Sequence, residues 1–187
     1  MNPTTRFVVF DFETTGLEPD ARIVELAAAW VDVQTGKVME RRHDLIDPQR
    51  SIPSATTGLH GITDDMVRGK PTIAAVLPRF LAFLARGPAV AHYALFDVQR
   101  LTFEAQRTGV ALPGTVPVFC SIEASRAVFP NEPSRSLLNL ARSLGLHRDG
   151  VAHRAAGDVS LTAQLVTKCL RKAACDLTAL APAVAML

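Results

Sequence analysis

An uninterrupted apolar run, FVVF at residues 7–10, stops directly at two carboxylates, Asp11 and Glu13. Because the run is continuous rather than alternating, it predicts a short strand over residues 6–12 that is buried on both faces. Such a strand needs a layer of structure above it and another below it. This feature limits the fold more than any other, since it favours a sheet covered by helices.

The rest of the chain adds strands early and helices later. Strands are predicted at residues 22–33 and 37–46, joined as a hairpin through the turn signal QTG, and shorter ones at residues 88–91 and 116–119. In the segment at residues 72–84, the regular helix is expected to begin just before Pro78, because proline suits the first turn of a helix. Apolar residues at helical spacing predict helices at residues 72–84, 94–107, 121–128, 136–144 and 155–172. This order predicts the α/β class.

The length and composition favour one compact unit. With 187 residues and 48% hydrophobic content, the chain can bury a sizeable core without disulfides or a structural metal. Residues 1–187 are therefore expected to form a single domain. The last stretch, residues 177–187, is apolar and rich in alanine, and the sequence leaves open whether it is a packing helix or a docking tail.

Charge and cysteine content exclude several classes of protein. The formal net charge is only +2, so no dense basic patch marks the chain as a nucleic-acid binder. Cys120, Cys169 and Cys175 are odd in number and lack a Cys-x-x-Cys spacing, which predicts reduced thiols in a cytoplasmic protein. No stretch reaches the ~18 apolar residues of a membrane span, so no membrane partner is expected.

The two carboxylates that end the first strand point to the same face. Residues i and i+2 of a strand project together, so Asp11 and Glu13 lie side by side while Phe12 enters the opposite layer. Two anions near a buried strand end repel unless a cation or a bound proton neutralises them. Oxygen ligands favour a hard cation such as Mg²⁺ or Mn²⁺. The alternative is a solvated strand end followed by an ordinary turn.

Two further candidates lie in and before the last long helix. Asp158 precedes Leu161 and Leu165 by three and seven residues, which places its carboxylate on the same inward stripe of the helix. His153 lies five residues earlier, so we expect it in the loop before the helix, leaning over the same site. An exposed loop histidine is the alternative interpretation.

A third acidic candidate follows the short strand at residues 88–91. Asp97 is close to the start of the next helix, where an acidic residue is also favoured by the helix dipole alone. His92 is interpreted as a packing histidine and is given no catalytic role.

Three segments taken together resemble the exonuclease motifs of the DnaQ-like, or DEDDh, 3'-to-5' exonucleases. They are DFETTG at residues 11–16, AHYALFD at residues 91–97 and HRAAGD at residues 153–158. HGIT at residues 60–63 and SLLNL at residues 136–140 are similar to further landmarks of the family. The similarity extends over about residues 6–170, and the order, spacing and residue types agree.

This resemblance implies a ribonuclease H-like fold, a mixed sheet of about five strands flanked by helices. It also implies two divalent cations, Mg²⁺ or Mn²⁺, held by Asp11, Glu13, Asp97 and Asp158. His153 would then be the general base, because an imidazole with a pKa near ~6.5 can accept a proton from water around neutral pH.

The resemblance also implies a seat for the terminal nucleotide after the first two carboxylates. Its residues would be Thr14, Thr15, Gly16 and Leu17, with further substrate contacts from His60 and Tyr93. The chain departs from the family at two places. Tyr93 stands where many relatives carry Asn, and Cys120-Ser121 stands where relatives often have Asp-Thr.

The function implied is a metal-dependent 3'-to-5' exonuclease that releases nucleoside monophosphates from single-stranded DNA, of the proofreading or repair type. Its partners would be nucleic-acid 3' ends and, by similarity to proofreading members, a DNA polymerase subunit. The alternatives are an RNA-trimming or oligoribonuclease-type enzyme, a non-catalytic nucleic-acid or polymerase-binding module, and a phosphatase. Glu13 makes the phosphatase a poor match to an Asp-x-Asp strand end.

Overall fold

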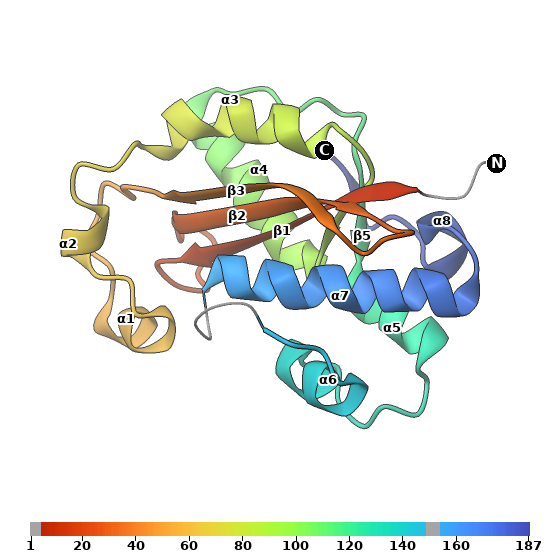
Figure 1. Cartoon of the computed structure of the whole chain (residues 1–187). Coiled ribbons are helices and arrows are strands. Elements are labelled where there is room, and N and C mark those ends of the chain that lie inside the picture. The colour runs from red at the N-terminus through yellow and green to blue at the C-terminus, as the bar shows by residue number, and fades with distance from the viewer. Residues whose placement is uncertain (1–4, 149–153) are drawn as a thin grey trace.

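The apolar run at residues 7–10 lies in β1 (Arg6–Thr14), a central strand of a mixed sheet (Figure 1). The computed structural model describes residues 5–148 and 154–187. In that part of the chain, six strands are hydrogen-bonded in the order β3-β2-β1-β4-β5-β6. The other five are β2 (Ile23–Asp32), β3 (Val38–Leu45), β4 (Ala89–Ala91), β5 (Pro117–Cys120) and β6 (Ala185–Met186).

The pairing directions make the sheet mixed. β1, β2 and β3 are antiparallel neighbours, while β4 and β5 run parallel to β1, and β6 returns antiparallel to β5. The predicted α/β class and the predicted hairpin of β2 and β3 are therefore confirmed. The described sheet has one strand more than the five or so expected.

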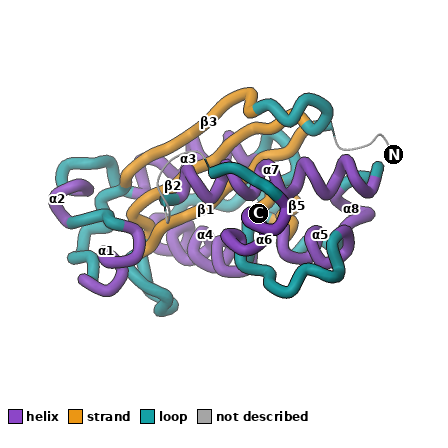
Figure 2. The backbone as a smooth tube through the Cα atoms, turned by 60° about the horizontal axis from the view of Figure 1, so that its bottom comes forward, coloured by secondary structure: helices purple, strands orange, loops and turns teal. Residues whose placement is uncertain are grey.

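The alternation of side chains along β1 divides the core into two layers. Val8, Phe10 and Phe12 project into one layer, which is covered by α3 (Ile73–Leu84) and α4 (Ala94–Thr108). Phe7 and Val9 project into the other layer. That second layer is covered by α7 (Ala155–Ala173), so helices lie on both faces of the sheet (Figures 1 and 2).

Helix α7 is buried on a second side as well. Its residues Leu161 and Leu165 pack against α5 (Ser121–Val128) and α6 (Leu137–Leu144) in a third cluster. The stripe that the sequence assigned to the core therefore faces these two helices, and a separate stripe containing Val159 and Val166 faces the sheet. Because both stripes are buried, α7 has little freedom to shift.

Two short helices were not predicted, namely α1 (Ser54–His60) and α2 (Asp64–Val67). Neither is long enough to show a helical repeat of apolar residues. Their boundary signals are nevertheless present, because Gly61 ends α1 with a left-handed φ of 73° and the side chain of Thr63 caps α2.

The helix predicted at residues 72–84 is present as α3, but the expectation that it becomes regular only just before Pro78 was wrong. α3 begins at Ile73, and Pro78 lies inside it. Proline lacks an N–H and so leaves the carbonyl of Ala74 without its helical partner. Both residues are on the exposed side of the helix, where water can solvate that carbonyl.

The C-terminal stretch resolves into two elements. α8 (Leu177–Leu180) is followed by β6, in which Ala185 pairs with Val118 of β5, and Leu187 is 1% exposed. The stretch therefore contains a short packing helix and an edge strand docked on the sheet. Among the described residues, no helix is both long enough and apolar enough to cross a membrane.

The aromatic cluster under α3 offers a test of the core. Phe80 is 2% exposed, and its ring centroid lies 6.2 Å from that of Phe10 and 5.5 Å from that of Phe12. Phe80→Ala should lower the free energy of unfolding by about 3–5 kcal/mol, because it leaves a cavity between sheet and helix. Urea denaturation measures the change. Leu59→Ala, at a side chain that is 57% exposed, is the control and should change it by less than about 0.5 kcal/mol. A loss below about 1 kcal/mol at Phe80 would contradict this packing.

Candidate active site

The register of β1 brings three carboxylates together. Asp11 and Glu13 are on the same face as Phe7 and Val9, which is the face that α7 covers. Asp158 lies in the first turn of α7. One carboxylate oxygen from each of Asp11, Glu13 and Asp158 lies within 4.8 Å of the others, close enough to share a metal ion.

The fourth predicted carboxylate approaches from the opposite layer. Asp97 is in the first turn of α4, and its side chain is only 2% exposed. Its negative charge raises the pKa of Asp11, so the two groups are close enough to interact. The structure therefore gathers the four acidic residues from three distant segments. Their role as metal ligands stays a prediction.

Burial, together with mutual repulsion, raises the pKa values of three of these acids. Burial raises the pKa of Asp11 well above its usual range, and the charges of Asp97, Asp158 and Glu13 raise it further. Burial and Asp158 raise the pKa of Glu13 to about 7. Burial also raises the pKa of Asp97, although backbone N–H groups of Asp97 and Phe12 oppose this by hydrogen bonding. A bound cation would relieve this repulsion.

A basic residue that the sequence analysis missed lies beside the cluster. Nη2 of Arg148 is 2.6 Å from Oδ1 of Asp158, and both side chains are mostly buried. A cavity of about 240 Å³ opens at this point, between β1, α6 and α7, and it is lined by Asp11, His92, Ser136, Leu137, Leu138, Arg148 and Asp158. No sequence motif marked Arg148, because its partner lies ten residues away in the sequence.

A second missed feature is the buried carboxylate of Glu25, directly opposite Glu13 in the pairing of β1 with β2. Glu25 is 0% exposed, and its oxygens accept hydrogen bonds from Nε of Arg154 at 2.9 and 3.1 Å and from the Ala155 N–H at 2.9 Å. Nε2 of His43 is 2.7 Å away. Burial alone would raise the pKa of Glu25, but these hydrogen bonds outweigh it and lower the pKa to about 2.

The residues predicted to seat the nucleotide are Thr14, which ends β1, and the three residues that follow it. Thr14, Thr15 and Gly16 are buried, whereas Leu17 is 80% exposed. The hydroxyl of Thr14 donates to the Gly16 carbonyl at 2.6 Å. A Cβ at Gly16 would lie 2.2 Å from a carboxylate oxygen of Glu18, so the end of that exposed side chain would have to move. Leu17 is therefore the one exposed side chain among these four residues.

His60 supports this segment from inside the molecule. It is 4% exposed, and its Nδ1 accepts a hydrogen bond from the Ile62 N–H at 3.0 Å. Nε2 therefore carries the proton and donates to the Thr14 carbonyl at 3.3 Å. Both ring nitrogens are thus used within the protein.

Tyr93 and His92 have opposite surroundings. Tyr93 is 64% exposed and has a left-handed backbone, with a φ of 64°, directly before α4. Asn adopts this conformation more readily than Tyr, which gives a physical reason for the Asn of many relatives. His92 is hydrogen-bonded to the Ser121 hydroxyl at 2.7 Å and to the Arg135 carbonyl at 2.9 Å, contacts that agree with a packing role. Burial lowers its pKa to about 4.

His153, the predicted general base, lies outside the described residues. The next residue in the sequence, Arg154, donates a hydrogen bond to the carboxylate of Glu25.

The sequence pattern of the family described as Exonuclease matches residues 8–166. The chain belongs to this exonuclease family. It is 35% identical over 168 residues to the DNA polymerase III subunit epsilon of Aquifex aeolicus, and the match covers 89% of this chain and 81% of that protein.

Two further comparisons agree with this assignment. The exonuclease is 34% identical over 169 residues to the 3'-5' exonuclease DinG of Bacillus subtilis; the match covers 89% of the chain but only 18% of DinG. A solved structure of exonuclease X in complex with 5' overhanging duplex DNA has a TM-score of 0.77 and 27% identity, covering 94% of this chain and 97% of that one. The chain is thus a 3'-to-5' exonuclease with the ribonuclease H-like fold, as expected.

The raised pKa of Glu13 predicts a pH-dependent stability for the metal-free exonuclease. Between pH about 4.5, the usual pKa of a glutamate, and about 7, the folded protein binds more protons than the unfolded chain. The contribution of Glu13 to the free energy of unfolding therefore falls as pH rises through this window. Glu13→Gln should remove that fall and be more stable than wild type at pH 8, by on the order of 1–3 kcal/mol.

Urea denaturation in the presence of a chelator, at pH 5, 6, 7 and 8, measures both proteins. Subtracting wild type from the variant cancels the titration of distant groups. A difference that stays constant across these pH values would show that the pKa of Glu13 is not raised.

Proposed function

We propose that this exonuclease removes nucleoside 5'-monophosphates from the 3' ends of single-stranded DNA, with two divalent cations, Mg²⁺ or Mn²⁺, as cofactors. The observation that carries the proposal is the approach of Asp11, Glu13 and Asp158 to within 4.8 Å of one another. Asp97, whose charge acts on Asp11, would complete the ligand set.

The donor chemistry fits these cations. All four groups are carboxylates, and hard divalent ions prefer oxygen ligands. Burial and mutual repulsion raise the pKa of Asp11, Glu13 and Asp97, which supports a bound cation as the neutralising charge. When bound, the ions supply Lewis-acid activation of the attacking water and of the scissile phosphate.

The residues of the chain then have separate tasks. His153 would take the proton of the water whose oxygen attacks the phosphorus, a role that suits an imidazole near neutral pH. The bond from phosphorus to the 3' oxygen breaks, and that oxygen takes up a proton as the shortened strand leaves. One nucleoside 5'-monophosphate is released in each cycle.

The end of β1 and the residues that follow it would seat the terminal nucleotide. The backbone of Thr14, Thr15 and Gly16 is close to Glu13, and the exposed side chain of Leu17 is available to pack against a base. Tyr93, also exposed, would stack on a base at the start of α4. His60 would act by holding the Thr14 carbonyl from behind rather than by touching the nucleotide.

DNA is proposed as the substrate because the epsilon subunit, which this chain resembles over most of its length, belongs to a DNA polymerase. The same similarity supports a polymerase subunit as a partner. We further propose that residues 1–187 form one exonuclease domain that works in the cytoplasm, where the free cysteines Cys120, Cys169 and Cys175 would stay reduced.

Asp158→Ala tests the cluster. It should lower the Mg²⁺-dependent release of nucleotides from an end-labelled oligonucleotide by about a hundredfold or more, because it removes a metal ligand. Circular dichroism should show an unchanged fold. The matched control is Glu123→Gln, which removes an exposed carboxylate on α5 paired with Arg126 and should leave the rate unchanged. A residual rate within tenfold of wild type would rule out Asp158 as a ligand.

The sugar preference is tested on DNA and RNA oligonucleotides of one sequence, each labelled at the 5' end. We expect DNA to be shortened faster, in single-nucleotide steps from its 3' end, with either Mg²⁺ or Mn²⁺. Faster shortening of RNA would replace DNA with RNA as the proposed substrate, since the 2'-hydroxyl is what distinguishes the two.

A further inference from the structure

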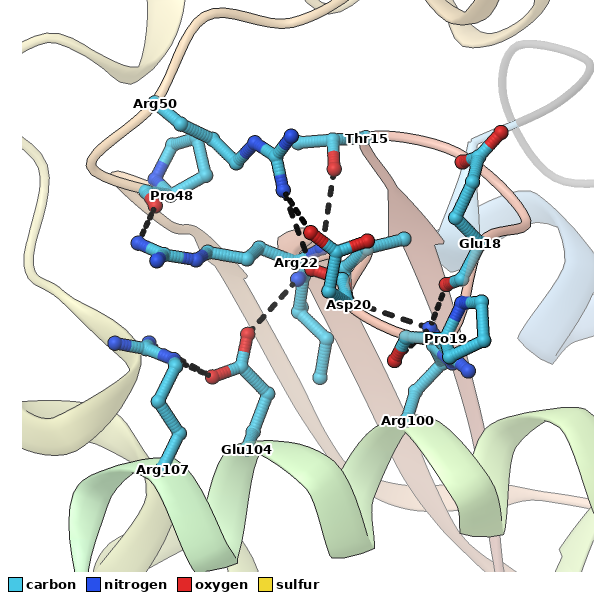
Figure 3. A network of polar contacts seen from close by, with 12 residues as sticks. Thr15, Glu18, Pro19, Asp20, Arg22, Pro48, Arg50, Arg100, Glu104 and Arg107 are labelled. Carbon is cyan, nitrogen blue, oxygen red and sulfur yellow. Dashed lines mark hydrogen bonds and ion pairs between the residues drawn. The ribbon is translucent and has the colours of Figure 1, made fainter.

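One arginine of α4 contacts the loop between β1 and β2. Arg100 is 5% exposed, and its Nη1 lies in contact with the carbonyl of Glu18, 3.0 Å from that of Pro19 and 3.5 Å from that of Ala21. Figure 3 shows the side chain rising from the helix into the loop. Three successive parts of one loop thus converge on a single guanidinium group.

The next turn of the same helix holds the end of that loop. Glu104 is 0% exposed, and its Oε1 accepts a hydrogen bond from the Ile23 N–H, the first residue of β2, at 3.2 Å. Its Oε2 accepts from Nε of Arg107 at 2.8 Å, which compensates the buried charge (Figure 3). Helix α4 therefore holds the loop through Arg100 and the first residue of β2 through Glu104.

The base of the loop is closed independently of α4. The Thr15 N–H donates to the Arg22 carbonyl at 2.8 Å, and the Arg22 N–H donates to the Thr15 hydroxyl at 3.0 Å. The side chain of Arg22 donates to the Pro48 carbonyl at 2.9 Å. These bonds fix the ends of the loop. Nearer its tip, the Ala21 N–H donates to the Glu18 carbonyl at 2.9 Å and Nη1 of Arg50 donates to the Asp20 carbonyl at 3.3 Å, while Arg100 holds the carbonyls of Glu18 and Pro19 from the side of α4.

Arg100 also lies on the helix that presents a catalytic-site carboxylate. It follows Asp97 by three residues, so about one helical turn separates the two side chains. Its guanidinium group is 5.5 Å from the centre of the Phe96 ring, which helps to fix its direction. One rigid element therefore links the acidic cluster to the loop that carries Leu17.

We propose that Arg100 is a positioning residue, which sets the place of the terminal nucleotide relative to the acidic cluster by holding the backbone of residues 15–22. The inference rests on the proposed function, because it takes residues 14–17 as the seat of that nucleotide. Arg100 acts through the loop and is not proposed to touch the substrate. A guanidinium group suits this task, since it is planar and always charged, and here its Nη1 alone contacts all three carbonyls.

The first experiment measures the loop without any substrate. Hydrogen exchange followed by mass spectrometry compares wild type with Arg100→Ala, Arg100→Lys and the control Arg126→Ala, whose exposed arginine is on α5. Peptides covering residues 15–22 should exchange at least about tenfold faster in Arg100→Ala, and less so in Arg100→Lys, which keeps one charged donor. Unchanged exchange in this region would overturn the inference, whatever the activity of the enzyme.

The second experiment measures kinetics on a 5'-labelled DNA oligonucleotide. KM, and the inhibition constant of the product nucleoside 5'-monophosphate, should both rise about tenfold in Arg100→Ala, while kcat changes by less than about twofold. Arg100→Lys should restore part of the loss. Calorimetric titration with Mn²⁺ should give the wild-type affinity, because the carboxylates are untouched.

These readouts separate positioning from a general loss of structure. A lower kcat with unchanged KM and inhibition constant would mean only that less enzyme is folded, and would overturn the inference. If Arg100→Ala does not fold, Arg100→Lys is tested in its place, and its hydrogen exchange, KM and inhibition constant decide whether the inference holds. A wild-type protein that releases no nucleotide from DNA or RNA would instead contradict the proposed function, while the exchange experiment still reports on the loop.

Discussion

The buried ion cluster of Glu25 is the contact on which the rest of the active site depends. A carboxylate with no exposure to water is stable only when its charge is matched, and Arg154, His43 and the Ala155 N–H do this together. These groups come from β2, β3 and the start of α7, so one charge joins three elements. It fixes where α7 begins, and Asp158 is three residues beyond Ala155.

The face of the sheet beneath α7 changes character along β1. Near the start of the strand this face is apolar, with Phe7 and Val9 in the core, and at its end it is acidic, with Asp11 and Glu13. Glu13 and Glu25 are directly opposite each other, yet their pKa values move in opposite directions. The difference lies in the hydrogen bonds, because His43 and Arg154 both bind Glu25 directly, whereas Arg154 acts on Glu13 only through its charge.

The sequence predicted those parts of the fold and site that follow from local periodicity. The two-residue period of a strand placed Asp11 and Glu13 together, and the helical period placed Asp158 on a buried side of α7. Glu25 could not be found in this way, since it is a single acid in an apolar strand and its partner Arg154 is 129 residues away. Arg100 likewise gains its role from carbonyl groups about 80 residues earlier. The catalytic roles, including that of His153, stay predictions because they need a substrate and metal ions.

The burial of α7 on two sides has a consequence for how this enzyme tolerates sequence change. Leu161 and Leu165 belong to the cluster with α5 and α6, while Val159 and Val166 belong to the cluster on the sheet. A change of volume in either cluster displaces the same helix, and with it the carboxylate of Asp158. The constrained positions therefore include more than the site residues. They extend along the whole helix to packing residues that do not contact the nucleic acid.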